Sequence, residues 1–178
     1  MSRAQPSINL LLSQDRISEA ISELADCLNE EYAENSLFLI AVLKGSICFV
    51  TDLMRKLNMD VEIGFIQASS YGQSGTERKE LTVSFLEPLD IEGKEVLLLD
   101  DIFDSGTTLA TLMRQLQEKR PRTLKTAVLL SKKVKRAVPF EPNYTLFDIE
   151  DRFVVGYGLD YKEKYRHLPA IYTLEERT

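Results

Sequence analysis

Three carboxylates and four small polar residues occupy one short stretch of the chain, from position 100 to position 108. Asp100 and Asp101 come directly after the apolar run Val96–Leu99, and Asp104 follows three positions later. Beyond this stretch, apolar residues recur at helical spacing. The pattern predicts a buried strand, a tight acidic turn, and a helix whose first turn is built from small polar residues, namely Ser105, Gly106, Thr107 and Thr108.

A helix that begins in this way offers backbone N–H groups and hydroxyls to an anion, and its partial positive charge favours a phosphate. The neighbouring carboxylates would repel a bare phosphate, so the ligand should also carry hydroxyls or a cation. Sugar hydroxyls donate to carboxylates, and Mg²⁺ binds both carboxylate and phosphate oxygens. We interpret the turn as a site for a ribose phosphate. The same residues would equally suit a capped helix that follows an acidic loop and binds nothing.

Other polar residues follow other predicted strands. Each group alone is weak evidence, because lysine-glycine turns are common and runs of basic residues are usually solvated. The carboxyl ends of parallel strands share one edge of a sheet, however, and open α/β sheets bind ligands there. Because they would meet at this edge, three groups are together candidates for one site. They are Lys44 and Gly45, the basic run of Lys132, Lys133, Lys135 and Arg136, and the set of Phe153, Asp160 and Arg166.

The elements that would position these residues alternate between strand and helix. This alternation predicts an α/β domain with a mostly parallel sheet. The helix at 47–57 should turn Ile47, Val50, Met54 and Leu57 inward. The predicted helices cover 13–34, 47–57 and 105–119, and the predicted strands cover 37–43, 61–67, 81–85, 95–99, 124–130, 143–149 and 153–158. The segment 68–80 lacks periodicity and is predicted to be a long loop that is either functional or disordered.

Composition excludes several classes of function. The chain has 178 residues, a formal net charge of −6 and a pI near 5.0, so non-specific binding to nucleic acid or to anionic membranes is not favoured. It shows no signal peptide and no apolar run of about 18 residues, which predicts a cytoplasmic protein without a membrane anchor. Cys27 and Cys48 are predicted to be small core residues rather than a disulfide pair. The single histidine, His167, argues against a histidine-based metal site.

The stretch VLLLDDIFDSGTTL at 96–109 resembles the ribose-5-phosphate loop of the type I phosphoribosyltransferases. Nearly the whole chain is similar to the bacterial type of hypoxanthine-guanine phosphoribosyltransferase. The resemblance implies the type I fold, with a core at about 37–158, a small hood from about 1–12 and 139–178, and a mobile loop at 68–80. The supporting blocks are LKGS at 43–46, SSYG at 69–72, LLSK at 129–132, FVVGYGLDY at 153–161 and KYRHLP at 164–169.

The resemblance also implies a role for each matching residue on the sugar-phosphate side. Asp104 matches the acid/base that serves N7 of the purine, and the residues from Ser105 to Thr108 match the 5-phosphate cradle. Lys44 and Gly45 match the pyrophosphate loop, in which the family has a cis peptide before the lysine, and Arg166 matches a pyrophosphate-binding arginine. Ser70 and Tyr71 match the mobile loop. Asp100 and Asp101 match the acidic pair at the ribose hydroxyls and the Mg²⁺ shell, and Asp160 matches a Mg²⁺ ligand.

On the base side, Lys132 matches the residue that bonds to the 6-oxo group, Phe153 the residue stacked on the base, and Val154 the residue whose backbone reads the base edge. The implied reaction transfers ribose 5-phosphate from 5-phosphoribosyl 1-pyrophosphate (PRPP) to N9 of hypoxanthine or guanine, giving IMP or GMP and pyrophosphate. The resemblance further implies Mg²⁺ as cofactor, 6-oxopurine bases as co-substrates and a homodimer or homotetramer.

Three alternatives remain at this level: an enzyme that prefers xanthine, a PRPP-sensing regulator of nucleic acid on the same fold, and a phosphoacceptor receiver domain. The net charge weighs against the regulator, and the placement of all three acids in one turn weighs against the receiver. The chain departs from the family at Asp100, where a glutamate is more usual, and it matches poorly at 139–150 and after Pro169.

Overall fold

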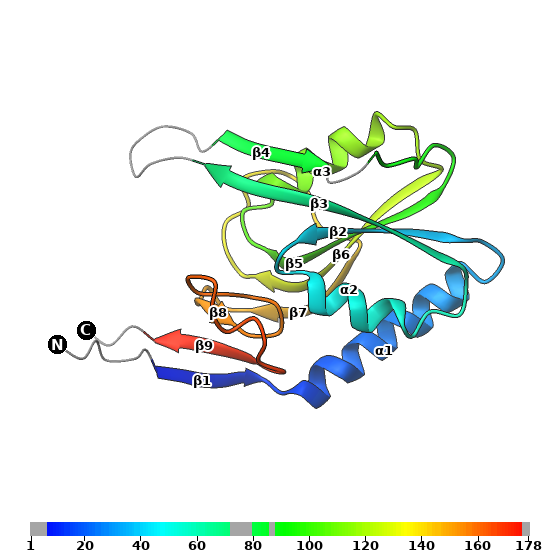
Figure 1. The fold of residues 1–178 in the computed structure, drawn as a ribbon. Helices are drawn as coiled ribbons and strands as arrows, with labels where there is room; N and C mark the ends of the chain where they lie inside the picture. The colour runs from blue at the N-terminus through cyan, green and yellow to red at the C-terminus, as the bar shows by residue number, and fades with distance from the viewer. Residues whose placement is uncertain (1–6, 72–79, 86–87, 176–178) are drawn as a thin grey trace.

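The structure is a computed structural model that describes residues 7–71, 80–85 and 88–175. Two β-sheets and three helices make up this part of the chain (Figure 1). In chain order the elements are β1 (Ser7–Leu12), α1 (Gln14–Glu31), β2 (Leu37–Leu43), α2 (Ile47–Met54), β3 (Val61–Tyr71), β4 (Glu80–Phe85), β5 (Glu95–Phe103), α3 (Thr107–Gln117), β6 (Thr123–Lys132), β7 (Tyr144–Ile149), β8 (Val154–Val155) and β9 (Ile171–Glu175).

The larger sheet has the strand order β4-β3-β2-β5-β6-β7. Strands β3, β2, β5, β6 and β7 run parallel, and β4 is an antiparallel edge strand. From the adjacent strands β2 and β5, the chain continues in opposite directions across the sheet, through α2 to β3 and through α3 to β6. Such a switch point separates the connections at the carboxyl ends of two strands and opens a crevice for a ligand.

Both faces of this sheet are covered by helices, as the continuous apolar strands predict. In β2, Leu37, Leu39 and Ala41 pack into one core cluster with α1 and α2. The alternate residues Phe38 and Ile40 pack into the other cluster with α3. Figure 1 shows α1 and α2 below the sheet and α3 above it. The predicted α/β class and mostly parallel sheet are therefore confirmed.

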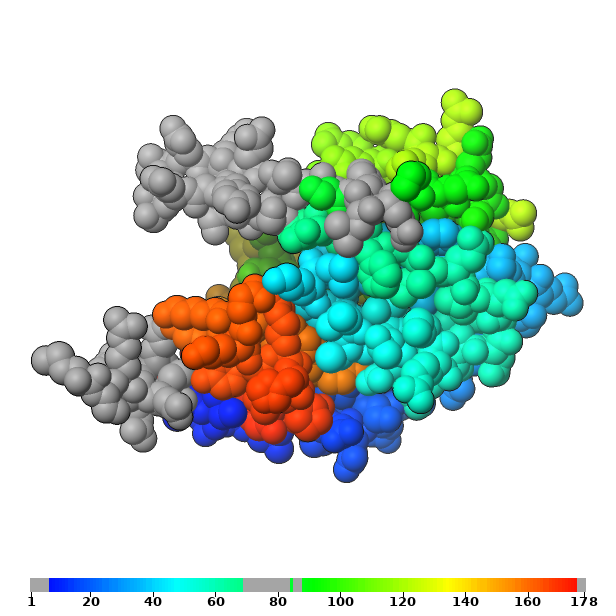
Figure 2. Space-filling model, viewed as in Figure 1, coloured from blue at the N-terminus to red at the C-terminus, as the bar shows by residue number. Residues whose placement is uncertain are grey.

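The smaller sheet, β1-β9-β8, is antiparallel and joins the two terminal segments. It lies beside the carboxyl ends of the main strands, and the molecule is hollowed above the C-terminal segment that precedes β9, drawn in orange (Figures 1 and 2).

The C-terminal part of the chain differs from its prediction in two ways. The strand predicted at 153–158 is shortened to β8, because Gly156 and Gly158 adopt positive φ angles of 95° and 96° and end the extended backbone. β7 belongs to the main sheet, although its residues fall within the range expected for the hood.

Two other predicted boundaries are wrong for a common reason, which is that polar strand ends resemble turns in the sequence. β5 runs on through Asp100 to Phe103 because β6 continues beside it, with Ile102 opposite Leu130. Similarly, β3 extends to Tyr71 because β4 pairs with it from Glu80 onward. The predicted loop is accordingly shorter than 68–80, and its centre, 72–79, lies outside the described residues.

Helix α2 also differs from its prediction. It ends at Met54, and both Ile47 and Met54 are exposed, whereas Phe49, Val50 and Leu53 face the core. Helical spacing alone fits several overlapping faces, and the packing of α2 against α1 and β2 selects one of them. Cys27 is exposed rather than buried, Cys48 is half-buried, and both are free thiols. In the part of the chain described here, the helices lack the length and apolar character needed to cross a membrane.

Candidate active site

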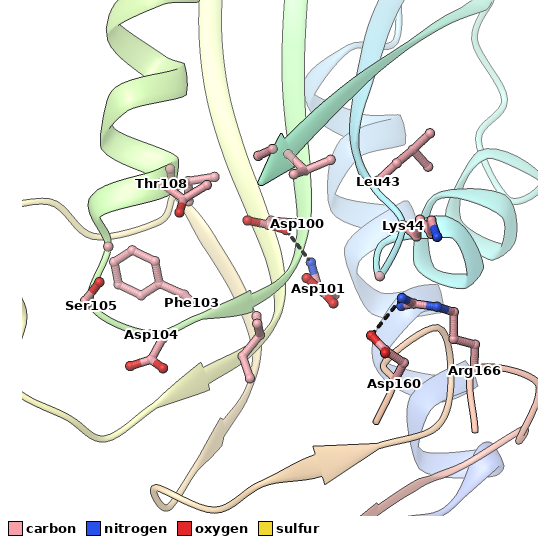
Figure 3. A pocket seen from close by; sticks show the side chains of 16 residues that line it. Leu43, Lys44, Asp100, Asp101, Phe103, Asp104, Ser105, Thr108, Asp160 and Arg166 are labelled. Atoms are coloured by element: carbon pink, nitrogen blue, oxygen red, sulfur yellow. Dashed lines mark hydrogen bonds and ion pairs between the residues drawn. The ribbon is translucent and has the colours of Figure 1, made fainter. Parts of the chain in front are cut away.

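A cavity of about 310 Å³ lies at the carboxyl ends of β2 and β5, at the switch point of the sheet. Five segments line it: the end of β2, Ala68 of β3, the end of β5, the turn into α3, and the loop that follows β8. Figure 3 shows Asp104, Ser105 and Thr108 on one side of this cavity and Lys44 and Arg166 on the other, with the carboxylate pair between them. The structure thus brings these residues together at one edge of the sheet, whereas Lys132, Arg136 and Phe153 of the predicted groups do not line the cavity.

The turn between β5 and α3 presents the start of a helix to the cavity. Gly106 caps α3 with a φ of 86°, a left-handed conformation that favours glycine. A Cβ at this position would lie 2.9 Å from Val138 Cγ2 and 3.1 Å from the Phe103 ring. Glycine therefore lets the turn fold back tightly, so that the N–H groups of the first helical turn and the nearby hydroxyls of Ser105 and Thr108 are available to an anion.

Asp100 and Asp101 separate the two sides of the cavity. They are neighbours in β5, so their side chains leave the strand in opposite directions, Asp100 toward Thr108 and Asp101 toward Lys44 (Figure 3). Asp100 is only 7% exposed, and its Oδ1 accepts the N–H of Asp101 at 3.0 Å. Burial, together with the adjacent charge of Asp101, raises the pKa of Asp100 well above its ordinary value. A cation or hydroxyl-bearing ligand would relieve this repulsion.

The opposite wall begins at the end of β2. The peptide bond between Leu43 and Lys44 is cis, as the resemblance implied. The following Gly45 leaves no room for a Cβ, because the Asp101 carboxylate lies against its backbone. The Lys44 ammonium forms an ion pair with Glu163, with 3.0 Å between Nζ and Oε2.

The loop after β8 completes this wall. The guanidinium of Arg166 forms an ion pair with Asp160 at 2.7 Å and donates to the Gly158 carbonyl at 2.8 Å, and it lies 3.3 Å from Glu163 Oε1. Gly158 packs so closely on Gly45 that a Cβ would overlap the Gly45 carbonyl oxygen. The hydroxyl of Tyr157 donates to Asp52 of α2 at 2.6 Å, which fixes the loop to the main domain.

The predicted base-binding residues lie beside the cavity rather than in its lining. Lys132 Nζ is 3.9 Å from Asp104 Oδ2 and 3.0 Å from Asp151 Oδ1. Phe153 is 51% exposed, with its ring centroid 5.6 Å from that of Tyr161, and Val154 is buried in β8. Of the other predicted residues, Thr107 lies at the start of α3 outside the lining, and Ser70 and Tyr71 lie near the end of β3, where the side chains are outside the described residues.

The carboxylates fit a magnesium ion that substrate oxygens help to hold. Asp100, Asp101 and Asp160 all line the same cavity, but no three Asp, Glu, His or Cys side chains form a closed metal site among the described residues. Mg²⁺ at phosphate sites typically uses one or two carboxylates together with phosphate oxygens. Asp100, which is buried, and Asp101, which is half-buried, both have raised pKa values because of their burial and are a suitable partial donor set.

Glu163 was not singled out from the sequence, and Arg136 was predicted only as one member of the basic run. Glu163 contacts both cations of the second wall, and it sits in a polar loop with no periodic signal. Arg136 is packed against the turn before α3, and its only signal was the basic run to which it belongs.

Comparison with known proteins identifies the family. The model of the phosphoribosyl transferase domain matches residues 8–162, and the chain therefore belongs to the phosphoribosyltransferases. Hypoxanthine-guanine phosphoribosyltransferases from Aquifex aeolicus and Streptococcus pneumoniae are 39% and 40% identical to it, over 95% and 94% of this chain and 96% and 93% of theirs. A crystal structure of a hypoxanthine-guanine phosphoribosyltransferase from Bacillus anthracis superposes with a TM-score of 0.88 and 37% identity, covering 96% of this chain and 99% of the other. Within the family, the chain belongs with the hypoxanthine-guanine phosphoribosyltransferases.

Proposed function

We propose that this protein is a purine salvage enzyme that transfers ribose 5-phosphate from PRPP to N9 of hypoxanthine or guanine, giving IMP or GMP and pyrophosphate. One observation carries the proposal. The N-terminus of α3, which suits a phosphate, lies on one side of the Asp100 and Asp101 carboxylates, and the cations of the facing wall lie on the other side. PRPP has the matching chemistry, since its ribose carries a phosphate at one end and a pyrophosphate at the other.

The turn at Ser105–Thr108 would hold the 5-phosphate through backbone N–H groups and hydroxyls. On the other side, Lys44, the Gly45 backbone and Arg166 would bind the pyrophosphate. The Nε–H of Arg166 is buried and has no acceptor among the residues described here, so a phosphate oxygen would satisfy it. Asp100 and Asp101 would accept hydrogen bonds from the ribose hydroxyls. With Asp160 they would also hold Mg²⁺, which when bound neutralises the leaving pyrophosphate.

Asp104 would exchange a proton with N7 of the purine while positive charge develops at C1 of the ribose. Its side chain is 58% exposed, and Lys132 Nζ lies 3.9 Å from its Oδ2. Lys132 would donate to the 6-oxo group, Phe153 would stack on the base, and the Val154 backbone would read the base edge. Because Asp104 and Lys132 are adjacent, the two groups can meet N7 and O6 on one edge of the same base.

The basic run at 132–136, which a regulator of nucleic acid would expose, is largely engaged within the chain. Lys132 pairs with Asp151, Lys133 with Glu150, and Arg136 with Glu141. This arrangement favours the enzyme over the regulator.

Pyrophosphate release from PRPP and Mg²⁺ tests the proposal directly, with hypoxanthine, guanine, xanthine, adenine and orotate supplied in turn. We expect turnover with hypoxanthine or guanine and little with adenine or orotate. Preference for xanthine would identify the alternative enzyme, and release with none of the bases would refute the proposal. Assembly as a homodimer or homotetramer and a cytoplasmic location belong to the same proposal. Light scattering and cell fractionation test them.

A further inference from the structure

Arg136 turns into the protein, unlike Lys133 and Lys135 of the same basic run, which are exposed. Its side chain is 20% exposed, and its guanidinium carbon lies 4.3 Å from the centroid of the Phe103 ring. Phe103 is the last residue of β5 and is buried. The stem and head of Arg136 therefore cover the end of the strand from which the acidic turn starts.

The guanidinium binds the main chain on both sides of the predicted base site. Nη1 donates to the carbonyl oxygens of Asp104 and Lys132, both at 2.7 Å, and Nη2 donates to the hydroxyl of Ser131 at 2.8 Å. The next residue reinforces the link, because the Ala137 N–H donates to the Ser105 carbonyl at 2.9 Å. A single side chain thus joins the end of β5 to the end of β6, beyond their last paired residues.

The two residues that Arg136 links are those that face one edge of the base. N7 and O6 of a 6-oxopurine are neighbouring acceptors on that edge. A proton carrier at N7 and a donor at O6 must keep a fixed separation, and the Asp104 and Lys132 side chains are 3.9 Å apart at their nearest polar atoms. Both side chains are flexible, so their separation depends on how firmly their backbones are held together.

We propose that Arg136 is a positioning residue that sets the spacing between Asp104 and Lys132 and thereby governs recognition of the 6-oxopurine edge. The inference rests on the proposed function. Lysine cannot take this role, because a guanidinium presents several donors in one rigid plane, whereas an ammonium is a point charge. On the PRPP side, Lys44 and Arg166 lie on the opposite wall, and Ser105 keeps its backbone hydrogen bond to Ala137 whatever the side chain at position 136, so binding of PRPP should be largely independent of the Arg136 guanidinium.

Three variants test the proposal by steady-state kinetics with each substrate varied separately. R136M keeps a long side chain over Phe103 but removes all the hydrogen-bond donors. R136K restores the positive charge without the planar guanidinium. K135A is the matched control, because Lys135 is the exposed neighbour in the same run. Thermal unfolding of each variant establishes that the enzyme is folded at the assay temperature.

We expect kcat/KM for hypoxanthine to fall about 10- to 100-fold in R136M, the scale of a misplaced catalytic group, while the KM for PRPP changes less than about twofold. The ratio of hypoxanthine to adenine turnover should fall as well, and R136K should recover only part of both losses. K135A should behave as the wild type. A purely structural role would alter the base and PRPP parameters together.

Two results would overturn the proposal while leaving the function in place. One is an R136M enzyme with the same base kinetics as K135A, and the other is an equal loss for base and PRPP. If R136M does not fold, R136K decides the matter, since full activity in R136K would show that the planar fork is not needed. Inactivity of the wild type and K135A with every base would instead refute the proposed function.

Discussion

The turn between β5 and α3 brings Asp104, Ser105 and Gly106 into the cavity from one continuous stretch, whereas the facing wall combines Lys44 from the first half of the chain with Arg166 from near its end. On the first side, a strand and a helix hold the functional groups through their own backbone hydrogen bonds. On the second, a loop rich in left-handed residues is held by close glycine packing and by ion pairs.

The two walls should therefore respond differently to substitution. A change of one side chain in the turn should remove a chemical group and leave the backbone of the site in place. A change in the facing wall should displace several groups at once, because Gly45, Gly158 and Arg166 depend on one another. Four substitutions measure how far this contrast holds, beginning with the largest expected effect.

Asp104→Asn should lower kcat by about 10²- to 10⁴-fold while leaving the KM values within a few-fold, because a proton carrier is lost and the turn is kept. Steady-state kinetics with hypoxanthine measures both parameters. Asp151→Asn is the control, since Asp151 is the other carboxylate beside Lys132, at 3.0 Å. An unchanged kcat in the Asp104 variant would rule out the assigned role, and an equal loss in both variants would show that freeing Lys132 is responsible.

Gly158→Ala should weaken pyrophosphate binding by about 100-fold, with a smaller effect on the nucleotide product IMP. The new Cβ would overlap the Gly45 carbonyl and push the Arg166 loop away from the pyrophosphate loop. Calorimetric titration with each ligand provides the measurement. Gly93→Ala is the matched control, because Gly93 also has a positive φ, 71°, but its Cβ would meet nothing within 4 Å. Equal losses for the two ligands would contradict the independence of the walls.

Asp100→Asn should stabilise the metal-free protein by about 1–3 kcal/mol, the scale of an uncompensated buried polar group, and should weaken Mg²⁺-dependent binding of PRPP. Because the pKa of Asp100 is raised, the cost of its charge in the folded state is complete above that pKa and shrinks as the pH falls from there toward the ordinary pKa of the unfolded carboxyl. The advantage of the variant should therefore shrink across this interval and be absent below it.

Urea unfolding at several pH values checks this expectation. Asp26→Asn, a change at an exposed position of α1, serves as its control. A stability difference that does not depend on pH would count against a buried charge at Asp100.

Glu163→Gln should strengthen pyrophosphate binding about two- to fivefold, as expected when an exposed ion pair that competes with the ligand is removed. Glu163 contacts both Lys44 and Arg166, and the hydrogen bond and charge of Lys44 lower the pKa of its carboxyl. Product-inhibition kinetics provides the measurement. Glu150→Gln removes a similarly exposed partner of Lys133 as the control. Weaker binding in the Glu163 variant would mean that this carboxylate supports the wall rather than competing for it.

The same contrast explains what the sequence could predict. The functional turn was predictable because its residues are contiguous and a strand followed by a helix fixes their geometry. The extent of β5 was not, since Asp100 and Asp101 belong to a strand only because β6 continues beside them. The packing of Gly158 on Gly45 joins positions more than a hundred residues apart, and no local pattern encodes that approach.

Arg136 shows a second limit of prediction from the sequence. A run of basic residues predicts a solvated surface, and for Lys133 and Lys135 this holds. Arg136 differs because its guanidinium reaches the Phe103 ring and the Asp104 carbonyl, which come from another part of the chain, as well as the nearby Lys132 carbonyl.

The pairing of β1 with β9 has a consequence for the order in which the protein is made. Among the described strands, β9 is the only neighbour of β1, and Thr173 Oγ1 donates to the Asn9 carbonyl across this junction. Synthesis begins at the N-terminus, so β1 stays without its partner until Glu175 has been added, whereas the main sheet is complete once β7 has been made. On the ribosome, the 5-phosphate cradle of the proposed site can therefore form before the small sheet that carries Val154 on the base side.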